Sequence, residues 1–152
     1  MTTQKDKAFA FKALHDNPGM FVLPNPWDVG SARMLAGLGF KALASTSAGF
    51  AASTGVADYQ IAHIRALAPA TPLPLTADLE NGFGHSPETC AETIRLGAEA
   101  GLVGGSIEDF TGDSARPQYG IAEAADRVRA AVEAANALPF PFLVTARAEN
   151  FF

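Results

Sequence analysis

The chain has 152 residues, of which 48% are hydrophobic and 18% are charged, and its formal net charge is -5. This length suits one domain with a sizeable core, and the negative charge, with Lys and Arg scattered along the chain, argues against nucleic acid or a membrane surface as a partner. The single cysteine, Cys90, excludes an internal disulfide and a cysteine-rich metal site. Because no stretch approaches the ~20 apolar residues of a membrane span and the N-terminus lacks a signal-peptide core, we expect a cytoplasmic protein.

Short apolar runs bounded by Pro and Gly alternate along the chain with helical stretches. Nearly all-apolar runs of this length are typical of strands that are covered on both faces. In chain order, the predicted elements are a strand at 20–25, a helix at 28–39, a strand at 41–46, a helix at 58–68, a strand at 72–78, a helix at 86–101, a strand at 102–109, a helix at 121–138 and a strand at 140–149.

Two of these helices carry the clearest local signals. Ser86 is the expected N-cap of the helix at 86–101, and Pro87 stands at its first helical position, where the missing N–H costs nothing. In the helix at 121–138, apolar residues recur at three- and four-residue spacing, which predicts one buried face. That face consists of Ile121, Ala125, Val128, Val132 and Ala135.

The alternation of strands and helices predicts an α/β fold with a parallel sheet. An open doubly wound sheet and a (β/α)₈ barrel both fit this pattern, but no G-x-G-x-x-G motif follows the first strand and polar residues gather after several strands, which favours the barrel. Eight βα units usually take ~250 residues. We therefore expect residues 1–152 to form a single domain, the N-terminal portion of a TIM barrel with roughly its first five βα units.

Polar side chains follow four of the predicted strands, and the carboxyl ends of parallel strands meet at one rim of a barrel. Alternation along a strand sends one residue of each neighbouring pair toward the site. Carboxylates brought together in this way repel each other unless a cation lies among them, and Asp, Glu and water oxygens suit Mg²⁺ better than zinc. The residues are Thr46 and Ser47, Asp78 and Glu80, Glu108 and Asp109, and Arg147 and Glu149, with Asp58 opening the next helix over the same rim.

Each of these signals also has a purely structural interpretation. Asp78 and Glu80 precede a glycine-rich turn, where such a pair often caps the turn or faces solvent. Arg147 can form a structural ion pair with Glu149 or Glu108, and hydroxyl groups after a strand often only satisfy backbone groups. The recurrence of these residue types at successive strand ends favours the functional interpretation.

The same residues resemble the isocitrate lyase/phosphoenolpyruvate mutase superfamily, over nearly the whole chain from about residue 19 to 152. The most specific feature is a pattern close to D-x-D-x-G-[FY]-G, followed by I-E-D. The resemblance implies a Mg²⁺-dependent TIM barrel, with Mn²⁺ as an alternative ion, that cleaves or forms C–C or P–C bonds in 2-oxo or 2-hydroxy acids. The matching segments are NPWDVGSARMLAGLGFKALASTSAG, GVAD, LTADLENGFG, GGSIED and TARAE.

For the metal, the resemblance implies three acidic ligands. Asp78 matches the family's main metal-binding aspartate, and Glu80 falls at its second acidic position, where the family usually has a shorter aspartate. Glu108 matches the glutamate of I-E-D, which serves the metal largely through water and is one of the implied catalytic residues. Asp58, in GVAD, matches an aspartate near the metal and substrate and is a second catalytic candidate.

For the substrate, the resemblance implies two groups of contacts. Thr46, Ser47 and Ala48 fall where the family binds the substrate carboxylate. Arg147 matches the arginine that holds the substrate and is the third catalytic candidate. A guanidinium suits this role, since it binds a carboxylate through two parallel hydrogen bonds. Family members are commonly dimers or tetramers, so the resemblance also implies a homo-oligomer for the full-length protein.

One segment departs from the family pattern. The lyases carry a K-[KR]-C-G-H loop after the fourth strand, whose cysteine is the catalytic acid and base, whereas residues 110–120 read FTGDSARPQYG. The chain therefore falls in a subgroup without that loop, and isocitrate or methylisocitrate cleavage by that route is disfavoured. The segment also lacks the asparagine-bearing gate of the phosphonate mutases.

The sequence leaves the reaction open. Decarboxylation, hydrolysis of an acyl or phosphonyl group, and aldol-type cleavage all pass through an enolate, and the residues above do not choose among them. Two other classes also stay open: an inactive half-barrel fragment, and a binding module for small dicarboxylates that forms no product.

Overall fold

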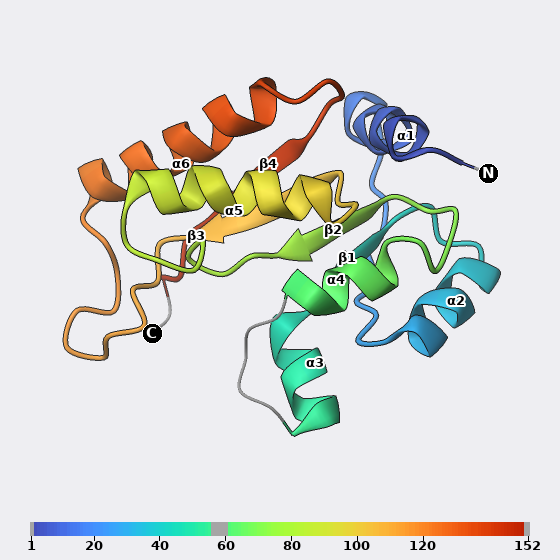
Figure 1. Cartoon of the computed structure of the whole chain (residues 1–152), viewed down its shortest axis with the longest axis horizontal. Coiled ribbons are helices and arrows are strands. Elements are labelled where there is room, and N and C mark those ends of the chain that lie inside the picture. The colour runs from blue at the N-terminus through green and yellow to red at the C-terminus, as the bar shows by residue number, and fades with distance from the viewer. Residues whose placement is uncertain (1, 56–60, 151–152) are drawn as a thin grey trace.

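The structure is a computed structural model that describes residues 2–55 and 61–150. Within these ranges, no helix has the length and apolar character needed to cross a membrane. The elements, labelled in Figure 1, are α1 (Gln4–Asp16), α2 (Val29–Gly37), β1 (Leu43–Ser45), α3 (Ser47–Thr54), α4 (Ile61–Leu67), β2 (Leu75–Asp78), α5 (Pro87–Glu99), β3 (Gly104–Glu108), α6 (Ile121–Asn136) and β4 (Leu143–Arg147).

The four strands form one parallel sheet in the order β1-β2-β3-β4. A doubly wound sheet reverses its strand order at a switch point, whereas here each strand is added next to the previous one. Helices α5 and α6 lie side by side on one face of this sheet (Figure 1). The arrangement is therefore an arc of a (β/α)₈ barrel, as the sequence predicts.

The predicted strand at 20–25 is wrong. These residues form no strand, although Ala44 N–H of β1 donates to Pro24 O at 3.1 Å and Asn25 Nδ2 donates to Ala44 O at 2.9 Å. Pro24 and Pro26 have no N–H to donate, so the segment cannot sustain a ladder beside β1. The described chain thus has four strands where the sequence predicted five.

Helix α1 covers the end of the sheet at which the strands begin. The sequence analysis did not predict this helix, although Thr3 and Asp6 form a capping box at its start. Its buried residues Ala8 and Phe11 pack against Ala42 and Val103, which immediately precede β1 and β3. This end of the sheet is therefore closed by apolar packing, and the opposite end remains for polar groups.

Helix α5 begins as predicted. Ser86 Oγ accepts a hydrogen bond from Thr89 N–H at 3.2 Å, and Pro87 is the first helical residue. Its buried face includes Ile94 and Cys90, both with no exposed surface. The helix is thus capped by its own sequence and packed against the sheet by its apolar face.

The predicted buried face of α6 is mostly wrong. Ile121 is 92% exposed and Val132 is 38% exposed, and the helix buries Ala135 together with Arg127, Ala131 and Ala134. Alanines occur on every side of this helix, so spacing alone does not single out one face. The alanine face allows close packing against α5, and Val128 and Val132 instead line a groove beside β4.

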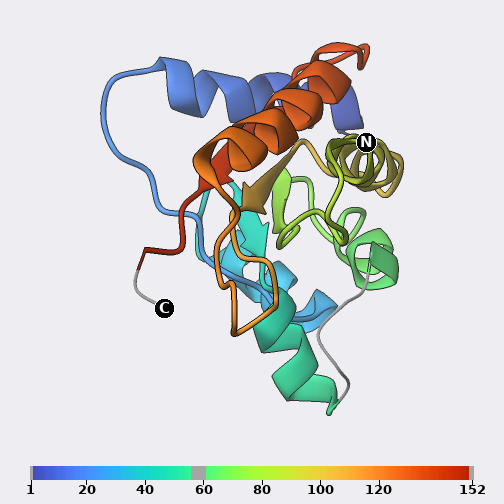
Figure 2. The same ribbon diagram turned by 90° about the vertical axis from the view of Figure 1, so that its left-hand side faces the viewer.

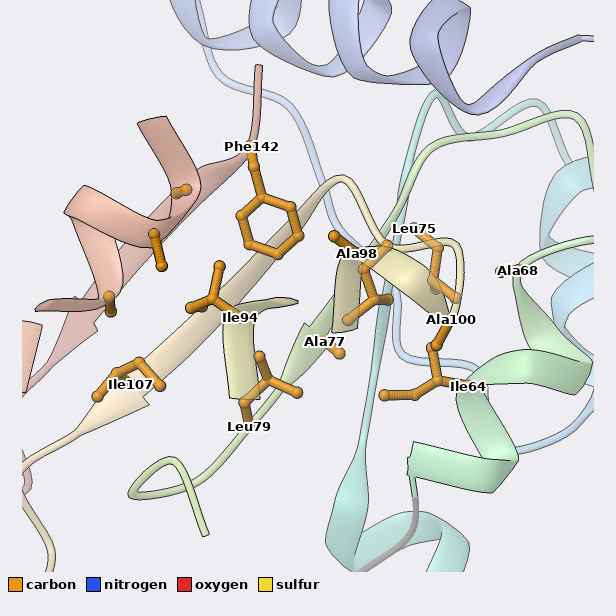
Figure 3. Close-up of a cluster of buried hydrophobic side chains, with 14 of the residues drawn as sticks. Ile64, Ala68, Leu75, Ala77, Leu79, Ile94, Ala98, Ala100, Ile107 and Phe142 are labelled. Atoms are coloured by element: carbon orange, nitrogen blue, oxygen red, sulfur yellow. The ribbon is translucent and has the colours of Figure 1, made fainter. Parts of the chain in front are cut away.

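The main core lies between the sheet and helices α4, α5 and α6 (Figure 3). Leu79, Ile94 and Ile107 are at most 1% exposed and lie close together in this view. A Cβ on Gly105 of β3 would lie 2.4 Å from Leu79 Cδ1, so this strand position needs glycine to admit the leucine. The residue between the two candidate ligands, Asp78 and Glu80, is thus anchored in the core.

Candidate active site

The sheet register places the polar strand ends on one face. Asp78 of β2 pairs with Ser106 of β3, and Glu108 of β3 pairs with Arg147 of β4. Neighbours in register point to the same side of a sheet, and so do residues two apart on one strand. These four side chains therefore share the face opposite to Leu79 and Ile107.

The convergence is direct at Arg147. Its Nη1 lies 3.7 Å from Asp78 Oδ2 and 3.7 Å from Glu108 Oε2, and its side chain stays 48% exposed. Arg147 Nε also forms an ion pair with Glu149. The predicted meeting of three strand ends is confirmed, and so are both structural ion pairs that the sequence left open for Arg147.

Asp78 is held by neutral donors as well as by Arg147. Ser47 Oγ donates to its Oδ2 at 3.4 Å, and Ser106 Oγ donates to its Oδ1 at 3.4 Å. Glu80 N–H donates to Oδ1 at 3.1 Å. The sequence analysis missed Ser106, although its position two residues before Glu108 on the same strand would have revealed it.

The Glu108 carboxyl lies in a site with excess negative charge. Burial and the neighbouring carboxylate of Asp78 raise its pKa to about 7, with smaller contributions from Glu149 and Glu80, and the guanidinium of Arg147 lowers it only in part. Its side chain is 12% exposed. A single guanidinium thus leaves this group of carboxylates short of positive charge.

Alternation separates the neighbours Glu108 and Asp109, as predicted. Glu108 faces the site, whereas Asp109 Oδ1 accepts from Glu149 N–H at 2.8 Å and Asp109 N–H donates to Arg147 O at 3.2 Å. Asp109 therefore fastens the end of β4 to the end of β3. Asp109 thus has a structural role in the described chain.

Glu80 lies in a turn with unusual backbone angles. Its φ is 48°, and the φ of Phe83 is 59°, a left-handed conformation that non-glycine residues rarely adopt. Glu80 O accepts from Glu108 N–H at 2.9 Å, so the backbone of the turn is bonded to the end of β3. Such outliers concentrate at functional sites.

The segment predicted to bind a substrate carboxylate forms the start of α3, a helix that the sequence analysis did not predict. Thr46 is its N-cap, and its Oγ1 accepts from Gly49 N–H at 3.1 Å. Ser47 and Ala48 are the first two helical residues, and Ser47 contacts Asp78. Free N–H groups at a helix start attract anions, so the placement agrees with a carboxylate partner. Asp58 lies outside the described residues.

Residues 110–120 fold back on themselves beyond the carboxyl ends of the strands (Figure 2). Phe110 and Gln118 form an antiparallel bridge, and Thr111 N–H donates to Pro117 O at 2.8 Å. Gln118 Nε2 donates to Glu149 O at 2.5 Å, which ties this loop to the chain after β4. The loop is therefore an ordered hairpin beside the site.

The donor set suits a magnesium ion that keeps most of its water. Within residues 2–55 and 61–150, no three His, Cys, Asp or Glu side chains form a ready metal cluster. Mg²⁺ usually retains several waters and takes only one or two protein carboxylates. Asp78 and Glu108 repel each other, and both lie beside the guanidinium of Arg147. Two such carboxylates meet the requirement of a hydrated Mg²⁺ ion.

The pKa of Glu108 gives a test that needs no substrate. Because folding raises this pKa from the ordinary 4.5 to about 7, the folded state binds the proton more tightly. The contribution to stability is complete below pH 4.5 and is lost as the pH rises through 7. In metal-free buffer, the free energy of unfolding should fall by up to about 3 kcal/mol between pH 5 and 8.

Glu108→Gln should remove most of this pH dependence, because glutamine carries no ionisable proton. Urea unfolding with a chelator present, at pH 5 and pH 8, measures the difference. Glu99→Gln, on the exposed side of α5, is the matched control and should keep the wild-type slope. Parallel pH profiles for Glu108→Gln and the wild type would contradict the assigned burial of Glu108.

Parallel strands in sequential order, with charged groups at their carboxyl ends, define the chain as part of a TIM-barrel enzyme fold. The family model for phosphoenolpyruvate phosphomutase matches residues 11–152. The chain therefore belongs to this family, within the isocitrate lyase/phosphoenolpyruvate mutase superfamily, as the sequence motifs indicate.

Three relatives illustrate the similarity. A candidate lyase/mutase from Burkholderia cenocepacia J2315 is 57% identical, with a TM-score of 0.93 over 97% of this chain and 55% of that chain. An oxaloacetate acetylhydrolase in complex with its product oxalate is 29% identical, with a TM-score of 0.83 over 97% of this chain and 54% of that chain. The 2-methylisocitrate lyase of Escherichia coli K12 is 32% identical over 142 residues, which cover 84% of this chain and 47% of the relative.

The chain spans less than half the length of the curated relatives that it matches, from 37% to 47%. The four described strands agree with a partial barrel. Its first and last strands, β1 and β4, are the edges of the sheet, and residues 145–148 at the end of β4 are exposed.

Proposed function

We propose that the chain carries the active site of a Mg²⁺-dependent enzyme that acts on 2-oxo or 2-hydroxy mono- or dicarboxylic acids. The reaction cleaves or forms a C–C or P–C bond through an enolate. The observation that carries the proposal is the convergence of Asp78 and Glu108 on Arg147, each 3.7 Å from its Nη1, at the carboxyl ends of three adjacent strands.

Asp78, Glu80 and Glu108 are the proposed metal-holding residues: one or two of them bind the ion directly, and the others, Glu108 above all, hold it through its waters. Asp78 is the best placed of them, because Ser47 and Ser106 orient its carboxylate. Mn²⁺ is the alternative ion, since it accepts the same oxygen ligands. When bound, such an ion supplies positive charge that stabilises electron-rich oxygen atoms of the substrate.

Arg147 is the proposed partner of the substrate carboxylate. Its side chain is 48% exposed, and a planar donor fork fits a carboxylate through two parallel hydrogen bonds. The same positive charge stabilises the enolate that forms when a bond near the carboxylate breaks. Thr46, Ser47 and Ala48 at the start of α3 bind the carboxylate from the other side, and Asp58 acts near the reacting atoms.

Two relatives indicate which class of substrate to expect. The acetylhydrolase acts on oxaloacetate and releases oxalate, and the curated relative is a lyase for 2-methylisocitrate. Both substrates are small acids with a carboxylate beside an oxygen-bearing carbon, a pair of groups that chelates a divalent ion. We expect the substrate of this chain to carry the same pair.

A substrate panel tests the proposal. The protein is incubated with 2-oxo and 2-hydroxy dicarboxylates, with Mg²⁺ or with a chelator, and pyruvate, glyoxylate and oxalate are measured as products. At least one acid should be consumed with Mg²⁺ and spared with the chelator. Binding of an acid without any product would favour the dicarboxylate-binding module, and neither binding nor turnover would contradict both functions.

The inactive half-barrel stays the second candidate because of one observation. Thr145, Ala146 and Arg147 of β4 are exposed, and among the described strands β4 pairs with β3. An exposed parallel edge is a site for association between chains. The substrate panel separates this candidate from the enzyme.

A further inference from the structure

The turn that follows β2 has an unusual backbone conformation, which its local hydrogen bonds hold only at Glu80 N–H (to Asp78 Oδ1) and Gly82 N–H (to Leu79 O). Glu80, Gly82 and Phe83 have φ values of 48°, 76° and 59°. Two of these residues are not glycine, and side chains disfavour this left-handed region. Contacts from other elements therefore matter for the turn that joins Asp78 to α5.

Three backbone carbonyl groups of this turn are bonded by side chains from the two helices above it. Arg127 of α6 donates through Nη2 to Asn81 O and through Nη1 to His85 O. Thr93 of α5 donates through Oγ1 to Gly82 O at 2.7 Å. Helices α5 and α6 thus both bind backbone carbonyl groups of the turn.

Arg127 is a buried charge whose hydrogen bonds go to this turn and whose guanidinium lies over one aromatic ring. The residue is 1% exposed, and no ion pair with an acidic residue is present for it among residues 2–55 and 61–150. Its Cζ lies 4.1 Å from the ring centroid of Tyr119, a cation–π distance. Burying an arginine without a carboxylate partner costs free energy. The two carbonyl groups and the Tyr119 ring are the contacts that offset this cost.

Tyr119, in the hairpin at 110–120, contacts both Arg127 and the turn. Its ring is 5% exposed, and its hydroxyl group is hydrogen bonded to His85 Nδ1 at 2.7 Å and accepts from Asn81 Nδ2 at 3.5 Å. Arg127 and Tyr119 therefore bind the same two turn residues, one through the backbone and the other through side chains.

We propose that Arg127 is a positioning residue for the active site: it holds the turn at 79–85 in the left-handed conformation that presents Asp78 and Glu80. Arg127 itself lies on the far side of the turn and contacts neither carboxylate through an ion pair. A guanidinium suits this role because it donates in two directions while its plane stacks on Tyr119, and a lysine ammonium cannot do both. The part of the proposal that concerns metal binding rests on the proposed function.

Hydrogen exchange tests the positioning role without any metal. Arg127→Met should accelerate the exchange of the amides at 79–86 at least tenfold and leave those at 104–107 of β3 and in the middle of α5 unchanged. Arg127→Lys should give a smaller acceleration, since an ammonium keeps the charge but lacks the planar fork that reaches two carbonyls while stacking on Tyr119. The matched control is Arg129→Met, two residues along the same helix, where the arginine is exposed and pairs with Asp126; it should exchange as the wild type does.

Metal affinity provides the second readout. Loss of a group that orients a metal ligand typically weakens binding by about 10- to 100-fold, so titration of Arg127→Met with MgCl₂, followed by calorimetry, should show a loss of this size. Tyr119→Phe, which keeps the ring and removes the hydroxyl group, should show a smaller loss. Should Arg127→Met not fold, Arg127→Lys and Tyr119→Phe decide the question by the same two measurements.

Each outcome separates this proposal from the proposed function. Unchanged exchange at 79–86 in a folded Arg127→Met protein would overturn the positioning role, and so would an equal acceleration over the whole sheet, which a merely structural residue produces. If the wild type binds no Mg²⁺ but the turn exchanges faster in Arg127→Met, the positioning role stands and the proposed metal chemistry fails.

Discussion

Asp78→Asn is expected to abolish Mg²⁺ binding and to lower turnover at least about 100-fold. Asp78 is the point where Ser47, Ser106 and Arg147 all meet. The amide keeps the shape and one oxygen of the carboxylate but loses the charge that attracts the ion. Calorimetric titration with MgCl₂ and product formation from the best acid of the substrate panel measure the two effects.

Asp109→Asn is the matched control for this variant. Asp109 is also an acidic residue at a strand end, but its Oδ1 accepts from Glu149 N–H, a bond that an asparagine oxygen can keep. We expect its metal affinity to stay within about threefold of wild type, since it removes no ligand. Wild-type turnover in Asp78→Asn would remove the enolate mechanism proposed for this site.

Leu79→Ala is expected to destabilise the protein by about 2–5 kcal/mol, the range measured for removing a large buried aliphatic side chain. Leu79 is fully buried, and its Cδ1 fills the space over Gly105 that a side chain on β3 would otherwise occupy. The alanine leaves a cavity there, over Gly105. Urea unfolding monitored by circular dichroism gives the free energy of unfolding.

The control for Leu79→Ala is Leu38→Ala, where the leucine is 70% exposed at the end of α2. That change should alter the free energy of unfolding by no more than about 0.5 kcal/mol. A loss below 1 kcal/mol for Leu79→Ala, by the rough scale of buried truncations, would mean that Leu79 is not part of a packed core. In that case the anchoring of the turn beside Asp78 would also be wrong.

Arg147 forms structural ion pairs and is also the proposed partner of a substrate carboxylate. These two roles do not exclude each other. The ion pairs to Glu108 and Glu149 are the structural interpretation that the sequence left open, and they are present. The Arg147 side chain is nonetheless half exposed, and the carboxylates around it are still poorly compensated, since the pKa of Glu108 is raised to about 7. Such a site gains from additional positive charge, which is why the functional interpretation remains the better account.

Local sequence patterns were reliable where a single residue or a short run decides the conformation. Apolar runs predicted the four observed strands, and Ser86 with Pro87 marked the start of α5. Acidic residues at the ends of β2 and β3 predicted a charged rim, because parallel strands end on the same side. These inferences need only local propensity and the geometry of a parallel sheet.

Other features depended on what packs against each segment, and no local pattern contains that information. Residues 20–25 read as a strand but cannot form a ladder next to β1, because Pro24 and Pro26 lack N–H groups. In α6, the tertiary structure buries Arg127 and exposes Ile121, the reverse of what hydrophobicity predicts. The arginine is inside because its partners are carbonyl groups of a turn more than forty residues away in sequence.

The sequence by itself therefore determined the fold class, the family and the strand ends that carry the acidic residues. Only the tertiary structure decided which member of each pair faces the site, which face of α6 is buried and what holds the turn around Glu80. The physical reason is how far apart in sequence the interacting residues are. Helix caps and strand runs are decided by neighbours in sequence, whereas the orientation of Glu108, the burial of Arg127 and the left-handed turn are decided by contacts between segments that only folding brings together.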